Sequence, residues 1–139
     1  MTRTERKLET AKRQLLKIKA EKKEKSIKQL KKQLWMLVSE KVRRSSAFCY
    51  TCGKKLPYEQ RNAGHFWPKG SHPATAFNLN NLRVQCRPCN HFKSGNLAKY
   101  SYRLLQELGQ LQFIVLGSLA HSPHKWDKNK LLTRISELA

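Results

Sequence analysis

Two Cys-x2-Cys units constrain this sequence more than any other feature. Cys49 and Cys52 form the first unit, Cys86 and Cys89 form the second, and 33 residues separate them. Each unit can fold as a tight turn that points two sulfur atoms at one place, so two units can surround a zinc ion. Four thiolates leave the ion no open position, which predicts a structural site that replaces a missing hydrophobic core. Gly53, directly after the first unit, suits the positive φ that such turns often need.

Disulfide bonds or free thiols are the alternatives to zinc, and the expected compartment argues against both. No apolar run approaches the roughly 18 residues that a membrane-spanning helix needs. The lysine-rich N-terminus lacks the apolar segment and cleavage site of a secretory signal. We therefore expect a cytoplasmic protein that is neither secreted nor membrane-bound. In that reducing compartment, paired cysteines hold metal more often than they form disulfides.

The net charge predicts a polyanionic partner. The chain has 29 Lys and Arg against 9 Asp and Glu, a formal charge of +20. A chain this basic repels itself unless it meets a polyanion, and nucleic acid is the commonest one. Charge alone leaves open a DNA-binding protein, a ribosome-associated RNA binder and a merely solvated helical surface.

The distribution of residue types predicts an α+β, mostly helical fold in three parts. Residues 1–44 contain sixteen Lys and Arg and five Glu but no Gly or Pro, which favours a long basic N-terminal helix. Residues 1–25 should be solvated, whereas 26–44 should dock on the domain or on a second copy of the chain, giving a possible homodimer. The docking stripe has helical spacing and consists of Ile27, Leu30, Leu34, Leu37 and Val38.

The remaining two parts are a metal-organised centre and a helical C-terminus. Residues 45–98 hold all four cysteines and are rich in Gly and Pro, which indicates loops with short strands. Residues 99–139 should form two helices packed on that centre. The first of these helices should run from Leu97 to about Leu116, and its apolar face should consist of Tyr100, Leu104, Leu108 and Leu111. The last helix should pack through Leu131, Leu132, Ile135 and Leu138.

Four further features lie between the cysteine units or just after them. They are His65 after Ala63-Gly64, Asn81, Asn90 next to Cys89, and the segment 93–96. This arrangement resembles the zinc-containing HNH, or His-Me finger, nucleases. In these enzymes a first histidine ends a strand, a middle asparagine lies in a loop, and the third residue opens a helix. The resemblance implies a small zinc-stapled ββα-metal centre.

A closer resemblance is to the phage recombination endonuclease family NinG. It covers roughly residues 27–139 and is specific in the central part of the chain, where residues 63–66, 71–77, 81–86, 89–90 and 93–97 carry it. The resemblance implies a metal-dependent endonuclease that cuts branched DNA, such as Holliday junctions or D-loops, with Mg²⁺ or Mn²⁺. If a phage encodes the chain, the compartment is the cytoplasm of the bacterial host.

Phosphodiester hydrolysis indicates a role for each candidate residue. Neutral His65 can take the proton of the attacking water, because the free imidazole has a pKa near 6.5. A divalent cation bound by Asn90 would screen the phosphate and the departing oxygen. By resemblance, Asn81 braces the loop so that the imidazole points at the water.

The carboxylate that relatives usually carry just before the histidine is missing. The positions before His65 are Asn62, Ala63 and Gly64, so His91 and Asn62 are the reserve ligands of the catalytic metal. Mg²⁺ tolerates few protein ligands because it keeps several waters. The missing carboxylate also supports the alternative of a non-catalytic zinc protein that binds DNA or RNA. In either case the predicted phosphate contacts are Arg43, Arg44, Arg83, Arg87 and Lys93.

Overall fold

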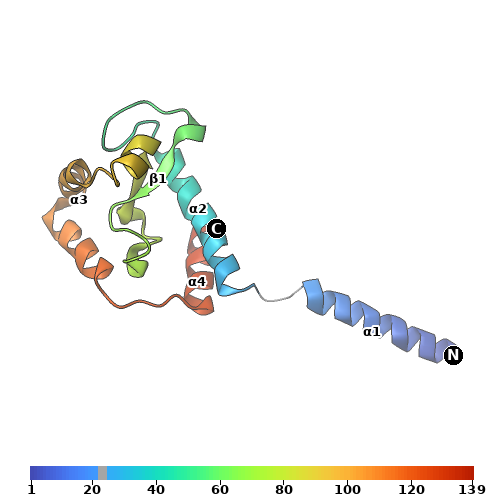
Figure 1. Cartoon of the computed structure of the whole chain (residues 1–139). Helices are drawn as coiled ribbons and strands as arrows, with labels where there is room; N and C mark the ends of the chain where they lie inside the picture. Colours follow the sequence, from blue (N-terminus) through green and yellow to red (C-terminus); the bar gives the residue numbers. More distant parts are fainter. Residues whose placement is uncertain (22–24) are drawn as a thin grey trace.

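A computed structural model of the chain describes residues 1–21 and 25–139. The fold is α+β and mostly helical, with helices around a small two-stranded sheet, as expected (Figure 1). The elements are α1 (Arg3–Glu21), α2 (Ile27–Ser45), β1 (Asn62–His65), β2 (Leu82–Gln85), α3 (Leu97–Ala120) and α4 (Lys128–Leu138). Short helical turns lie at Tyr58–Gln60, Pro73–Thr75, Leu79–Asn81 and Pro88–Phe92.

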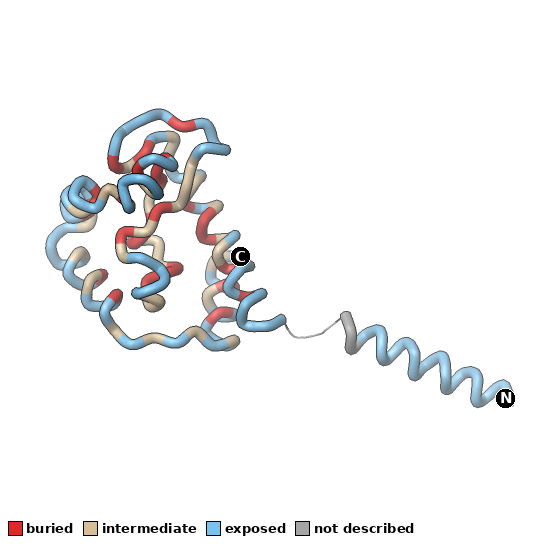
Figure 2. The backbone as a smooth tube through the Cα atoms, viewed as in Figure 1, coloured by how far each residue is buried: buried red, intermediate tan, exposed pale blue. Residues whose placement is uncertain are grey.

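The N-terminal segment forms two helices, which corrects the prediction of one long helix over residues 1–44. The Ser26 hydroxyl accepts a hydrogen bond from the Gln29 amide, and the Gln29 side chain accepts one from the Ser26 amide. This capping box begins α2 as a separate helix. The side chains of residues 1–18 are all exposed, which agrees with a solvated basic helix (Figure 2). The part of the prediction that covers residues 22–24 lies outside the described residues.

The predicted stripe of α2 packs inside the chain. Leu30, Leu34 and Val38 are buried, and Val42 extends the stripe by one turn. Ile27 stays 38% exposed at the start of the helix. The buried residues join β2 and α4 in one apolar cluster, so this stripe is not a free surface for a second copy of the chain.

The helix α3 is interrupted at Gly109, which has φ 80° and ψ 162°. Before this residue Tyr100 and Leu104 are fully buried, as predicted. After it the phase of the helix changes, so Leu116 is buried whereas Leu111 is 71% exposed. The prediction of Leu111 on the buried face is therefore wrong, because one extended glycine ends the periodicity.

The last helix, α4, closes the apolar cluster beside α2. The Asp127 carboxylate accepts a hydrogen bond from the Lys130 amide and begins the helix. Leu131 and Ile135 are buried as predicted, whereas Leu132 is 48% exposed. Within the described parts of the chain, no helix combines the length and apolar character that a bilayer crossing requires.

The strands β1 and β2 pair antiparallel and carry the central residues. His65 lies opposite Leu82, and Asn62 lies opposite Gln85. The Tyr100 hydroxyl donates a 2.8 Å hydrogen bond to the Gly64 carbonyl, which ties α3 to β1. A Cβ atom at Gly64 would lie 2.0 Å from the Gln85 Oε1 atom, so this position accepts only glycine without rearrangement.

Candidate metal centre and active site

The four cysteine thiols converge at one place. Their sulfur atoms all lie within 4.8 Å of one another. The first unit is closed by the isolated bridge between Phe48 and Lys55, and Gly53 between them has the predicted positive φ, 79°. The second unit begins directly after β2. The cluster could hold a metal ion such as zinc, because four sulfur ligands at this spacing match its preferred ligand set.

The ionisation of the thiols fits a bound cation. Burial would raise the pKa of Cys49, but hydrogen bonds from Thr51 and nearby backbone amides outweigh burial and lower it to about 6. Burial and neighbouring thiols raise the pKa of Cys86 to about 12. Thiols this close therefore do not all ionise on their own, whereas a divalent cation would supply the charge that allows it.

A buried glutamine that the sequence analysis missed connects the thiols to the strands. The Gln85 Nε2 atom donates to the Thr51 hydroxyl at 3.1 Å and to the Gly95 carbonyl at 2.8 Å. The Thr51 hydroxyl in turn lies 3.5 Å from the Cys49 sulfur atom. Gln85 thus links β2, the first cysteine unit and the loop after the second unit. The available signal was a glutamine at the end of β2, directly before Cys86.

His65 ends β1 and has a defined protonation pattern. Its Nε2 atom lies 2.8 Å from the Ala76 carbonyl oxygen. Because a carbonyl only accepts hydrogen bonds, Nε2 carries the proton and Nδ1 carries the lone pair of the neutral ring. In the part of the chain that the structure describes, Nδ1 has no hydrogen-bond partner, so a proton acceptor is left for a substrate or a water.

The surroundings of His65 favour its neutral form. The imidazole stacks on the Trp35 indole of α2, with ring centroids 5.2 Å apart and an angle of 15° between the planes. Burial lowers the pKa of His65 below 6.5, and the positive charge of Lys69 lowers it further. The hydrogen bond to Ala76 acts in the opposite direction but does not outweigh them. Trp35 was not among the predicted site residues, because it lies in another element 30 positions earlier in the sequence.

Asn81 is fully buried and braces the loop after His65. Its Oδ1 atom accepts from the Trp67 amide at 2.8 Å. Its Nδ2 group donates to the carbonyls of Trp67, at 2.9 Å, and Thr75, at 3.1 Å. All three of these hydrogen bonds join the amide to backbone atoms, so Asn81 fixes the path of the chain from Trp67 to Thr75. The Ala76 carbonyl that meets His65 follows directly on that path.

The predicted ligands of the catalytic metal form no ready cluster. Asn90 and His91 lie in the turn Pro88–Phe92, half-buried and exposed respectively. Asn62 starts β1 and His65 ends it, and a separation of three positions places their side chains on opposite faces of the sheet. The structure therefore does not bring Asn62 to His65. Across residues 1–21 and 25–139, the four cysteines are the one group of at least three His, Cys, Asp or Glu side chains arranged for a metal.

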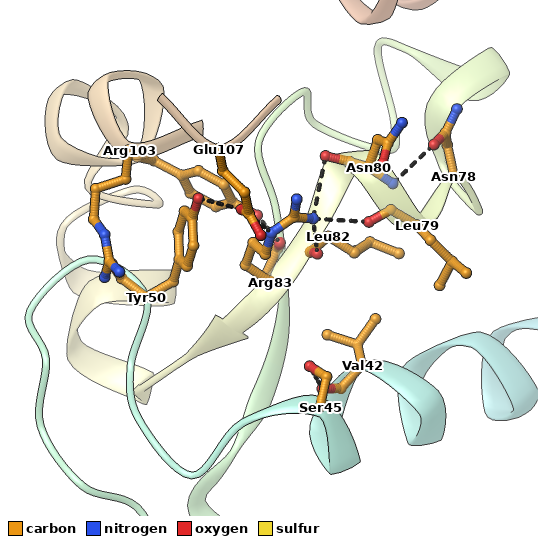
Figure 3. Close-up of polar contacts among 12 residues, drawn as sticks. Val42, Ser45, Tyr50, Asn78, Leu79, Asn80, Leu82, Arg83, Arg103 and Glu107 are labelled. Atoms are coloured by element: carbon orange, nitrogen blue, oxygen red, sulfur yellow. Dashed lines mark hydrogen bonds and ion pairs between the residues drawn. The ribbon is translucent and has the colours of Figure 1, made fainter. Parts of the chain in front are cut away.

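Arg83, predicted as a phosphate contact, is instead engaged within the chain (Figure 3). Its Nε atom pairs with the Glu107 carboxylate at 2.9 Å, and its Nη1 atom donates to the Leu79 carbonyl at 2.9 Å. The Tyr50 hydroxyl donates to the same carboxylate at 2.5 Å. Burial would raise the pKa of Glu107, but these hydrogen bonds and the nearby guanidinium charges lower it below its usual range. Arg83 is thus a bracing residue between β2 and α3.

The other predicted phosphate contacts differ in how free they are. Arg44 pairs with Glu40 at 2.7 Å, and the Arg43 guanidinium lies over the Tyr58 ring at 5.6 Å. Arg87 and Lys93 are exposed at the second cysteine unit, and the Arg87 guanidinium lies 6.0 Å from the centre of the Phe92 ring. Neither forms an ion pair with another described residue, so both remain available to a phosphate.

Comparisons with known proteins agree on one relationship. A family model described as "Bacteriophage Lambda NinG protein" matches residues 1–138. "Protein ninG" of Escherichia phage lambda is 37% identical over 78 residues, which cover 56% of this chain and 37% of that protein. "Protein ninG" of Salmonella phage P22 is 35% identical over 78 residues, with 56% and 37% covered. The chain therefore spans well under half the length of these relatives. No solved structure matches it closely enough for comparison.

Proposed function

This chain belongs to the NinG family of bacteriophage proteins, and we propose that it is a metal-dependent endonuclease of the HNH type that cuts branched DNA. The observation that carries the proposal is the hydrogen bond from His65 Nε2 to the Ala76 carbonyl. It fixes the ring so that Nδ1 is the basic atom, and the lowered pKa keeps that atom unprotonated at neutral pH. The order of β1, β2 and the turn Pro88–Phe92 supports a ββα centre.

In the proposed mechanism His65 is the general base. Nδ1 takes the proton of the water that attacks phosphorus, and the Ala76 carbonyl stabilises the imidazolium because it accepts a hydrogen bond from Nε2–H. Asn81 is a positioning residue that holds the loop leading to Ala76. Mg²⁺ or Mn²⁺, with Asn90 as the proposed ligand and His91 in reserve, would stabilise charge on the phosphate and the leaving oxygen.

The remaining parts of the site have proposed structural and binding roles. The four cysteines hold a structural Zn²⁺ that fixes the turn carrying Asn90. Arg87, Lys93 and the basic helix α1 bind DNA phosphates whatever the base sequence. The affinity for DNA should therefore fall steeply as the salt concentration rises.

A second candidate function is a non-catalytic, zinc-containing protein that binds DNA or RNA. The lack of a carboxylate at the positions just before His65 favours it, because Mg²⁺ sites in proteins usually use one or two carboxylates. Arg83 does not distinguish the two functions, since its contacts are internal.

Replacement of His65 tests the proposed chemistry. We expect His65→Ala to lower cleavage of a labelled four-way junction at least about 100-fold, the range typical of a lost general base. DNA binding should stay within about twofold, because the phosphate contacts remain. The assay uses zinc-loaded protein with added Mg²⁺ or Mn²⁺ and compares the junction with linear duplex. Tyr102→Ala, which removes a 65% exposed ring on the surface of α3, is the control.

The outcomes separate the two candidate functions. Equal loss of cleavage and binding in a folded His65→Ala chain would contradict the general-base role. Tight binding by the native chain with no cleavage of any DNA would favour the accessory function. A strong preference for RNA with no cleavage of DNA would contradict the endonuclease and favour an accessory protein that binds RNA.

A further inference from the structure

A basic and aromatic pocket lies beside His65, and the proposed chemistry does not use it. It encloses about 420 Å³. Its walls include three aromatic side chains and three lysines: Trp35, Phe77, Trp126, Lys31, Lys32 and Lys69. The pocket joins α2, the loop before β2 and the segment before α4, which are far apart in the sequence.

Two walls of the pocket are also the contacts of the His65 imidazole. Trp35 stacks on the ring, and the carbonyl of Ala76, which also lines the pocket, accepts the hydrogen bond from Nε2–H. A molecule in the pocket would therefore lie one side chain away from the proposed general base. A nucleotide next to a phosphate held at His65 could therefore reach the pocket.

The charge of the pocket is one-sided. Lys31, Lys32 and Lys69 are exposed, and none forms an ion pair with another described residue. Among the described residues that line the pocket, none is Asp or Glu. The Lys69 ammonium lies 5.6 Å from the centre of the Trp35 ring, over its face. Such a wall attracts an anion that also carries a flat ring.

The aromatic walls are held in place before any ligand arrives. The Trp126 Nε1 atom donates to the Pro73 carbonyl at 2.8 Å. The same indole packs edge-on against Phe77, with ring centroids 5.2 Å apart. Aromatic surfaces that are already fixed lose little conformational entropy when a base stacks on them. Every base offers a flat face for this contact.

We propose that this pocket binds an unpaired nucleotide of DNA, with its base against the Trp126 indole and its phosphates at the lysines. The inference rests on the proposed function, because it takes DNA as the substrate. A paired base has both faces covered by its neighbours and cannot enter, whereas a base at a fork, flap or open junction can. The pocket would thus supply the preference for branched DNA.

Binding without cleavage tests this proposal. Fluorescence anisotropy compares a perfect duplex with the same duplex carrying a single-stranded arm of thymidines, in zinc-containing buffer without Mg²⁺ or Mn²⁺. The test chains are Lys31→Glu with Lys69→Glu, and Trp126→Leu, which keeps the charge. The matched control is Lys55→Glu with Lys99→Glu, two exposed lysines away from the pocket. Thermal unfolding confirms that each variant is folded.

We expect the native chain to bind the armed duplex about fivefold more tightly than the plain duplex, as stacking of single-stranded bases predicts. Both pocket variants should bring this ratio to about one, whereas the control should weaken both complexes equally and keep the ratio. An unchanged ratio in folded pocket variants overturns the proposal, as does tighter binding of a uridine RNA arm.

The pocket and the nuclease chemistry can fail separately. If the ratio behaves as expected but no DNA is cut, the pocket assignment stands and the proposed nuclease function falls. If His65-dependent cleavage is found but the ratio is one in the native chain, the nuclease function stands and the pocket assignment falls.

Discussion

At the scale of single residues, the surroundings of His65 should determine how the cleavage rate depends on pH. A general base works when neutral, so cleavage is present above the pKa and is lost as pH falls through it. Because burial and Lys69 lower that pKa, the acid limb of the single-turnover rate should have its midpoint below pH 6.5. Lys69→Gln removes the cation and should move the midpoint upward, whereas Lys99→Gln should not. A midpoint above 6.5 in the native chain would argue against His65 as the base.

Asn81 should matter mainly because it is buried. Asn81→Ala leaves one amide and two carbonyls of the loop without their partner. We expect the free energy of unfolding to fall by about 3 kcal/mol, since each orphaned buried group costs about 1–3 kcal/mol and the loop can relax in part. The neighbouring Asn80→Ala, at an exposed position, should change it by less than about 0.5 kcal/mol. Urea unfolding followed by tryptophan fluorescence, with zinc present, measures both, and equal effects would contradict the bracing role.

Residues in short local motifs were easier to single out from the sequence than residues whose role depends on a distant partner. His65 and Asn81 stood out because they lie in short motifs between the cysteine units. Trp35 looked like an ordinary apolar residue of a helix, because its contact with His65 exists only after α2 packs on the sheet. Arg83 was predicted to contact phosphate, because the sequence does not show that Glu107, which lies in another element, pairs with it.

At the scale of elements, the β1–β2 pair depends on the missing side chain at Gly64. Gly64→Ala would place a Cβ atom 2.0 Å from Gln85 Oε1 inside the protein. We expect a loss of about 1–3 kcal/mol in the free energy of unfolding, the usual cost of overpacking. Gly70→Ala is the matched control, since no atom of the described residues lies within 4 Å of its added Cβ.

A double-mutant cycle identifies the clash as the cause. Gln85→Ala shortens the side chain that the new Cβ meets, so the double variant Gly64→Ala with Gln85→Ala should lose less than the sum of the single losses. Strict additivity would place the effect of Gly64→Ala in the backbone instead.

The boundaries of the helices were harder to predict than their buried faces. The faces of α2 and α4 follow from three- and four-residue spacing, which packing against a single core preserves. Ser26 and Gln29 form the capping box that begins α2. This short pattern is hard to recognise in the sequence, because the lysine-rich residues on both sides of it also favour helix. Gly109 ends a periodicity that otherwise looks continuous, since glycine inside a helical pattern is often tolerated.

At the scale of the whole molecule, the cysteine cluster lies where otherwise separate parts meet. One apolar cluster joins α2, β2 and α4, whereas Phe66, Tyr100, Leu104 and Leu116 form a second, smaller cluster under α3. Gln85 and the two cysteine units connect the strands to the loop before α3. A fold with two small clusters depends on the connection between them more than a fold with one large core does.

Loss of zinc should therefore affect the whole central region. We expect the native chain to bind one zinc ion, measured by elemental analysis, and Cys89→Ala to lose it. Structural zinc contributes on the order of 10 kcal/mol of binding free energy to small domains, which is comparable to the total stability of about 5–15 kcal/mol of a typical domain. Cys89→Ala should accordingly lose cooperative thermal unfolding and junction binding together. In the native chain, removal of zinc by a chelator should have the same effect, and Zn²⁺ but not Mg²⁺ should reverse it. A zinc-free chain that still unfolds cooperatively at an unchanged temperature would show that the two apolar clusters suffice, and that the thiols serve another purpose.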